Sequence, residues 1–210
     1  MILSIAKREF NSMFLSPLAW VILAVIQVIL AWSFFSYVDE FFRIQSDLTT
    51  IKNAPGVTDL VASPLFEVAS VVLLMVTPLL TMRLISEEKR NKTISLLLSS
   101  PVSITEVVLG KYLGLLLFIS TILIMLIMMP LSLAMGTELD LIKLFSGFFG
   151  LFLMLAAFGA AGLYMSSLTD NPMIAAISTF GLLLLLWMIS VNSASATGST
   201  SAVSYTHLRA

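Results

Sequence analysis

The chain is 210 residues long; 59% of its residues are hydrophobic, 11% are charged, and the formal net charge at pH 7 is −1. Soluble domains carry roughly 25% charged residues, so this composition excludes a water-soluble fold and indicates an integral membrane protein. The balanced charge gives no indication of nucleic-acid binding. Cysteine is absent, which excludes disulfides and cysteine-based metal or redox chemistry.

Residues 1–16 have the pattern of an amphipathic helix. One face carries Ser4, Lys7, Arg8 and Asn11, and the other carries Ile2, Leu3, Ala6, Phe10, Met13 and Phe14. This division predicts a helix that lies in the membrane interface rather than crossing the bilayer. Glu9 falls inside the apolar face. Its carboxylate either reaches back to water or forms an ion pair with a basic residue such as Arg83.

Five later stretches are long and apolar enough to cross a bilayer as helices, which takes about 20 residues. They cover approximately residues 18–38, 65–82, 112–133, 144–168 and 173–189. Their length, and the need to satisfy backbone polar groups internally, favour helices over strands. We therefore expect an all-α polytopic membrane protein, with an N-terminal interfacial elbow helix (1–16) and a membrane-spanning region over 17–190.

Basic residues alternate between the segments that connect these spans. Lys7, Arg8, Arg83, Lys89, Arg90, Lys92 and Lys111 lie before the first span and between the second and third, whereas Arg43, Lys52 and Lys143 lie in the first and third connections. Because positively charged loops stay in the cytoplasm, this distribution predicts a cytoplasmic N-terminus and a cytoplasmic 83–111 loop.

The segment 83–114, RLISEEKRNKTISLLLSSPVSITEVVLGKYLG, is too long and too amphipathic for a simple connection. Pro101 is expected to end one short helix, because the residue before a proline avoids the α region. Ser103 and Glu106 have the spacing of a capping box, which starts the next helix. That helix is expected to continue without interruption into the third span.

Several short motifs occur together in and around this segment. They are PLLTMR (78–83), EEKR (87–90), TI (93–94), LLLSSPV (96–102) and VLGKYLG (108–114), with KREF (7–10) and SPL (16–18) near the N-terminus. In combination they resemble the permease subunit of type-2 ABC exporters, in the branch associated with gliding motility and related auxiliary transport. The resemblance covers approximately residues 5–190.

The chain departs from the family pattern at two positions. Lys92 stands where relatives usually have glycine, and Ser95 stands where they usually have an acid. A glycine there would ease a helix break through a positive φ. Asn91 is expected to supply that conformation instead.

The resemblance implies six spans, so a sixth span is expected to be missing from this chain. Residues 191–210 change to a polar, low-complexity sequence, and the last eight, VSYTHLRA (203–210), resemble the translation of a sequencing adapter. We therefore expect a C-terminally truncated fragment whose tail is either this artefact or an ordinary disordered segment. His207, the single histidine, is assigned no chemistry.

The resemblance also implies the partners and the residues that contact them. No GxxxxGK[ST] motif occurs in the chain, so ATP and Mg²⁺ are expected on a separate ABC ATPase subunit. The residues expected to contact it are Glu87, Glu88, Lys89, Arg90, Thr93, Leu96, Leu97, Leu98 and Pro101. A second permease copy or a paralogue is expected as dimer partner, in a bacterial inner membrane, and we expect no catalytic, cofactor-binding or metal-binding residue in this chain.

Glu67 is the one carboxylate well inside an apolar run, so it either lines a translocation path or is an interfacial acid. Three other functions compete with transport driven by a separate ATPase. An ion-coupled carrier usually needs several buried acids and repeated halves, which the sequence lacks. A scaffold or assembly factor stays open, whereas an intramembrane enzyme lacks HExxH, GxSxG and a histidine within the spans. The substrate class is open among lipid, polysaccharide, peptide, drug and metal cofactor.

Overall fold

The computed structural model describes residues 2–48, 55–92, 103–137 and 139–207, without the side chains of 46–48, 135 and 190–207. Every regular element in these ranges is helical. The elements are α1 (Ile2–Leu15), α2 (Pro17–Leu48), the π-helix η1 (Thr58–Ala62), α3 (Ser63–Thr81), α4 (Ser86–Arg90), α6 (Ile104–Ser132), the 3₁₀-helix η2 (Leu133–Met135), α7 (Leu141–Leu168) and α8 (Pro172–His207). Within the described ranges, five helical stretches are long and apolar enough to cross a membrane.

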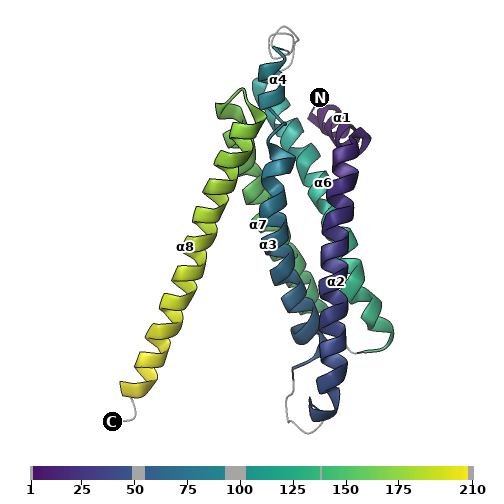
Figure 1. Ribbon diagram of the computed structural model, residues 1–210, viewed down its shortest axis with the longest axis vertical. Helices are drawn as coiled ribbons and strands as arrows, with labels where there is room; N and C mark the ends of the chain where they lie inside the picture. Colours follow the sequence, from purple (N-terminus) through teal and green to yellow (C-terminus); the bar gives the residue numbers. More distant parts are fainter. Residues whose placement is uncertain (1, 49–54, 93–102, 138, 208–210) are drawn as a thin grey trace.

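The long helices run side by side in an elongated bundle (Figure 1). At one end lie α1, α4 and the turn between α7 and α8; we call this the elbow end. At the other, the far end, lie the end of α2 and the connection between α6 and α7 (Figure 1). The alternation expected from the sequence is therefore present, because the first and third connections lie opposite α1 and α4.

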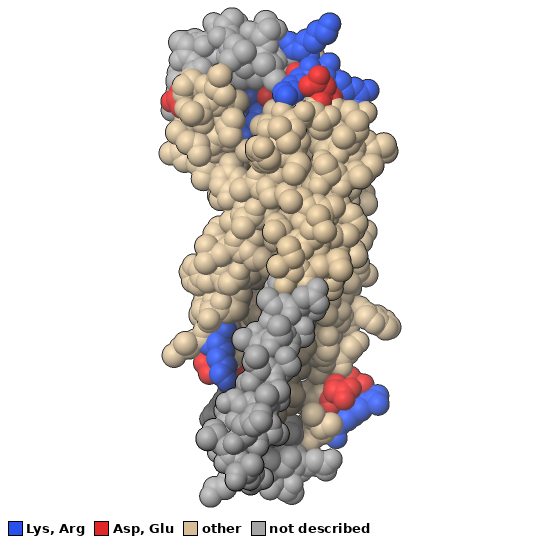
Figure 2. Space-filling view, turned by 90° about the vertical axis from the view of Figure 1, so that its left-hand side faces the viewer, with Lys and Arg blue, Asp and Glu red and all other residues tan. Residues whose placement is uncertain are grey.

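Charged side chains gather at the two ends of the molecule, and a broad band without them separates the ends (Figure 2). Large apolar side chains are exposed along the spanning helices, including Val28 on α2, Leu153 on α7 and Ile177 on α8. Such a band suits the hydrocarbon core of a bilayer, which is about 30 Å thick. The chain is an all-α polytopic membrane protein.

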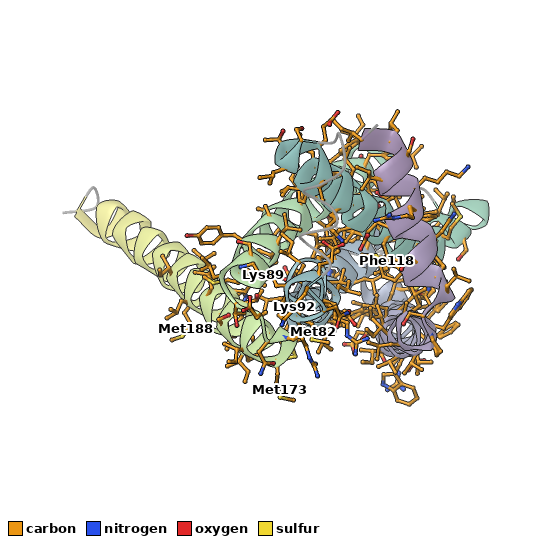
Figure 3. The ribbon with its side chains drawn as sticks, turned by 90° about the horizontal axis from the view of Figure 1, so that it is seen from above. Met82, Lys89, Lys92, Phe118, Met173 and Met188 are labelled. Carbon is orange, nitrogen blue, oxygen red and sulfur yellow. The ribbon has the colours of Figure 1, made fainter. Side chains whose placement is uncertain are left out.

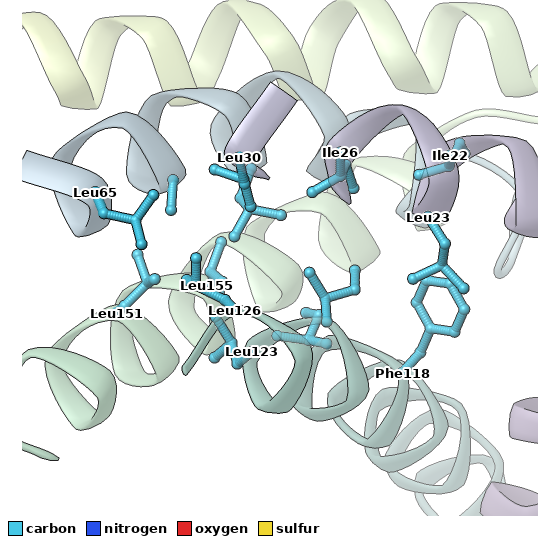
Figure 4. Packing of buried hydrophobic residues seen from close by; sticks show 14 of the residues in the cluster. Ile22, Leu23, Ile26, Leu30, Leu65, Phe118, Leu123, Leu126, Leu151 and Leu155 are labelled. Atoms are coloured by element: carbon cyan, nitrogen blue, oxygen red, sulfur yellow. The ribbon is translucent and has the colours of Figure 1, made fainter. Parts of the chain in front are cut away.

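The helices pack through one cluster of buried aliphatic and aromatic side chains at the centre of the bundle (Figure 4). Leu23 of α2 points toward Phe118 of α6, and Leu65 of α3 lies against Leu151 of α7 (Figure 4). Lipid tails are as apolar as these side chains, so close van der Waals packing, rather than exclusion of water, holds such a cluster together.

The break between α1 and α2 lies at Ser16, immediately before Pro17. Proline suits the first position of a helix, because its missing N–H would be unpaired there in any case. The indole N–H of Trp20 donates to the carbonyl of Phe14, at 2.8 Å, and so satisfies a carbonyl at the end of α1. The sequence thus separates the elbow helix from the first span, as expected.

Two helices extend beyond the spans expected from the sequence. α2 continues to Leu48 rather than 38, and at about 1.5 Å per residue its 32 residues measure about 48 Å, longer than the hydrocarbon core. No glycine or proline interrupts it, and an ion pair of 2.8 Å joins Arg43 to Asp39 one turn earlier. α8 continues as a helix to His207, well past the expected end at 189.

Candidate functional site

Several ion pairs and hydrogen bonds between distant parts of the chain lie at the elbow end, where α1, α4, α6 and the α7–α8 turn come together. In the view from above, Lys89 lies on the side of α4 that faces α7 and α8 (Figure 3). The contacts of α4 with its neighbours hold the charged segment that the sequence singles out.

Lys111 of α6 lies between two carboxylates from distant parts of the chain. Its Nζ atom is 2.9 Å from an Oε atom of Glu88 on α4 and 3.3 Å from an Oε atom of Glu9 on α1. The side chain of Lys111 is only 4% exposed, and those of Glu9 and Glu88 are 17% and 22% exposed. An ammonium so removed from water needs such partners, because desolvation of an unpaired charge is costly.

The pair of glycines around Lys111 allows α1 to reach it. A Cβ atom on Gly110 would lie 2.7 Å from Cβ of Ile5, and one on Gly114 would lie 2.8 Å from Cβ of Glu9. Real side chains do not approach so closely, so the GxxxG spacing lets the backbone of α1 lie directly against α6. The two glycines thus serve close packing between α1 and α6 within this chain.

On its other side α4 is fixed to the end of α7. The Ser166 hydroxyl accepts hydrogen bonds from the backbone N–H groups of Ile85 and Ser86, at 3.2 and 3.1 Å, and donates to the carbonyl of Met82 at 3.1 Å. These bonds satisfy backbone groups exactly where α3 has ended and α4 begins, so the break between the two helices is held by α7.

A second contact on this side comes from Lys89. Its ammonium donates to the carbonyl of Ser167 and lies 3.9 Å from a carboxylate oxygen of Asp170 in the α7–α8 turn. Asp170 is 77% exposed, so this ion pair is screened by water. Glu88 and Lys89, neighbours in the sequence, therefore attach α4 to opposite sides of the bundle.

The expected capping box starts α6. The N–H of Glu106 donates to the Ser103 hydroxyl at 3.3 Å, and the N–H of Ser103 donates back to a carboxylate oxygen of Glu106 at 3.1 Å. From there α6 runs unbroken to Ser132 and includes the third span. A displacement at its first turn would therefore be carried along a single rigid helix.

The turn after α4 corrects one detail of the sequence analysis. Asn91 has a φ of −82°, whereas Lys92 has a φ of +56°. The left-handed conformation thus occurs at Lys92 and not at Asn91, where it was expected. A non-glycine residue adopts it at a cost of about 1 kcal/mol or more.

The residues expected to contact an ATPase differ in their surroundings. Glu87 and Arg90 are exposed on α4, whereas Glu88 and Lys89 already have partners within the chain. Five of the expected residues, Thr93, Leu96, Leu97, Leu98 and Pro101, lie outside the described residues. Their role therefore stays a prediction.

Two other sequence expectations concern Glu9 and Glu67. Glu9 is paired with Lys111 and not with Arg83, although Arg83 lines the same open polar pocket, with Arg8, Glu87 and Asn91. Glu67 is exposed on α3, on the stripe that also carries Val71, Met75 and Leu79, so its carboxylate faces away from the packed centre of this chain.

The sequence analysis did not single out Lys111, Ser166 or Asp170 as site residues. The position of Lys111 could have indicated a role, because an ionisable residue at the start of an apolar run is expected to have a specific partner. Nothing in the sequence around Ser166 and Asp170 indicated a role, since a serine at a helix end and an acid in a turn are ordinary surface features. The described residues contain no group of three or more His, Cys, Asp or Glu able to hold a metal ion.

Comparison with known families shows which family the chain belongs to. The sequence model of the family described as ABC-2 family transporter protein matches residues 3–207, nearly the whole chain. The chain belongs to the ABC-2 family of transporter proteins, and it is a membrane component of an ABC transporter. Comparison with the curated proteins and with the solved structures gives no match.

Proposed function

We propose that the chain is the permease subunit of an ATP-binding cassette exporter and couples ATP hydrolysis by a separate ATPase subunit to substrate movement. The observation that supports this most is the position of α4. It is a short charged helix attached on one side to α1 and α6, and on the other to α7 and the α7–α8 turn. A force applied to α4 would reach both sides of the bundle. ATP and Mg²⁺ belong to the partner ATPase in this proposal.

The distribution of basic residues supports a cytoplasmic elbow end. Lys7, Arg8, Arg83, Lys89, Arg90, Lys92 and Lys111 belong to the helices and turns of this end. The described residues of the far end contribute Arg43 and Lys143. By the positive-inside rule the N-terminus and the 83–111 loop then lie in the cytoplasm, as suits an exporter of the bacterial inner membrane.

The proposed contact with the ATPase combines charge and an apolar anchor. Glu87 and Arg90 are exposed and would set register and partner choice. Leu96, Leu97 and Leu98, with Thr93 and Pro101 beside them, would supply the apolar side chains that enter a groove of the ATPase. Glu88 and Lys89 would contribute by holding α4 against the neighbouring helices of this chain.

A second permease, either a copy of this chain or a paralogue, would complete the path for substrate. Most residues of the spanning parts of α7 and α8 are not buried within this chain, and α3 exposes the stripe from Glu67 to Leu79. Lipid or a second permease must cover these apolar surfaces. In this proposal the stripe faces the substrate path, and Glu67 lies close to its outer end.

The test is purification of the tagged chain from its own membranes, followed by measurement of the bound ATPase and of its ATP hydrolysis. The double charge reversal E87K/R90E is expected to lose most of the bound ATPase. The reversal D39K/R43E is the matched control, because it exchanges an exposed acid and an exposed arginine at the far end. It should retain both binding and hydrolysis.

Two outcomes would contradict the proposal. A wild-type chain that binds no ABC ATPase would favour a scaffold or an ion-coupled carrier. ATPase binding that survives deletion of residues 87–98 would show that the contact lies elsewhere.

A further inference from the structure

Lys111 is the one charged residue among those classed as buried in the described parts of the chain. Its partners come from far away: Glu9 precedes it by 102 residues and lies on another helix, and Glu88 lies on a third. The two carboxylates thus converge on a single ammonium group from two different helices, α1 and α4.

The three side chains differ in how firmly the rest of the fold holds them. Glu9 is placed by the contact of α1 with α6, where Gly110 and Gly114 admit the backbone of α1. Glu88 belongs to a helix of only five residues, too short to be stable on its own. The position of α4 relative to α6 therefore depends on Lys111 far more than the position of α1 does.

The contacts of α4 are also unequal in strength. The ion pair between Glu88 and Lys111 is short and nearly buried, whereas the one between Lys89 and Asp170 is 3.9 Å long and largely exposed. Exposed pairs contribute little, while loss of one partner of a buried pair leaves an uncompensated charge. If α4 is displaced, the ion pair between Lys89 and Asp170 should therefore break first, while Glu88 stays paired with Lys111. α4 would then rotate about the backbone of Ile85 and Ser86, which the Ser166 hydroxyl holds.

We propose that Lys111 is a positioning residue that joins α4 to the elbow helix and to α6, so that these three elements move as one unit when α4 is displaced. The proposal rests on the proposed function for the source of the displacement, which is the ATPase. It assigns to Lys111 a role that is distinct from ATPase binding, because its ammonium is covered by the chain itself.

The first experiment measures whether α1 and α4 keep a fixed distance from each other, and it needs no ATPase. The chain contains no cysteine, so spin labels can be attached to S4C on α1 and N91C at the end of α4, both exposed positions. The full-length protein in lipid nanodiscs is expected to give one narrow distance distribution between the labels. E88Q should broaden it, whereas K7M, which removes an exposed lysine of α1, should leave it unchanged.

The second experiment measures coupling in the complex with the co-purified ATPase. E88Q and K111M should retain the bound ATPase but lower its stimulated hydrolysis about tenfold or more, as expected on losing a hydrogen bond between charged groups. The triple variant E9K/E88K/K111E reverses every charge of the cluster and should recover part of the stimulation, whereas K111E alone should not. K7M serves again as the control.

The outcomes separate the two proposals. If the wild-type chain binds no ATPase, the proposed function fails, while the spin-label distances still test Lys111. If E88Q leaves both the distance distribution and the stimulation unchanged, the role assigned to Lys111 is overturned. E88Q keeps the pair between Lys111 and Glu9, so it tests the proposal even if K111M does not fold.

Discussion

Two lysines join helices at opposite ends of the bundle with ion pairs of nearly equal length. At the elbow end Lys111 lies 2.9 Å from Glu88 and 3.3 Å from Glu9. At the far end Lys143 of α7 lies 3.1 Å from a carboxylate oxygen of Asp59 in η1. The lysine side chain is 4% exposed in the first case and 55% exposed in the second.

The comparison shows that distance alone does not rank these contacts. Water screens the pair at the far end, where the charges would be nearly as well solvated if they were apart. At the elbow end the three groups have given up most of their hydration, so each depends on the others. A lysine–carboxylate pair of similar length therefore contributes little to stability at the far end, whereas stability depends on it at the elbow end.

The strongest challenge to this comparison is K111M. The substitution leaves Glu9 and Glu88 facing each other in a partly dry site, and we expect it to lower the free energy of unfolding by about 3–5 kcal/mol. Unfolding of the purified protein in mixed micelles, followed by circular dichroism, measures the change. A loss below about 1 kcal/mol would mean that water enters the site and that the two ends do not differ.

The second prediction separates packing from charge at the elbow end. In G114A the new Cβ atom would lie 2.8 Å from Cβ of Glu9, so α1 must shift away from α6. We expect a destabilisation of about 1–3 kcal/mol, the usual result of inserting a methyl group into a filled site. The same unfolding assay applies.

Gly150 provides the control, because a Cβ atom there would meet nothing within 4 Å. G150A should be neutral or stabilising by up to about 1 kcal/mol, since alanine is the better helix former. Equal effects of the two substitutions would show that α1 does not rest on Gly114.

The smallest effect is expected for K143M at the far end. Removal of an exposed ion pair should cost between about 0 and 1 kcal/mol, and high salt should reduce the difference from the wild type. The measurement is the unfolding free energy at low and at high salt concentration. A cost as large as that of K111M would mean that the exposed pair of Lys143 stabilises the fold as much as the buried pairs of Lys111.

Local features of the sequence predicted a large part of this arrangement. Ser103 and Glu106 lie three residues apart, and a capping box needs only those two side chains and the backbone between them. The five apolar runs and the proline after Ser16 are local in the same sense. Each can be recognised without knowing which other part of the chain lies nearby.

Where the structure differs from the features expected from the sequence, the difference has a physical cause. α2 continues past 38, where charged residues begin, because Asp39 and Arg43 form an ion pair along a further turn outside the apolar run. The end of the membrane span at 38 stays a prediction. Asn91 was preferred over Lys92 for the left-handed turn because asparagine tolerates it better; the position of the turn, rather than the residue type, decided the outcome. Of the two alternatives for Glu9, the ion pair with a basic residue is present, and its partner is Lys111 rather than Arg83.

The sequence by itself determined the membrane class, the number of long apolar helices, the elbow helix and the start of α6, because apolar length, periodicity and capping act over a few residues. Only the tertiary structure decided which charges meet. Lys111, Glu9 and Glu88 lie on three helices, and their contact depends on the depth to which Gly110 and Gly114 let α1 approach α6. Pairings of this kind arise from packing between helices, which no local pattern encodes.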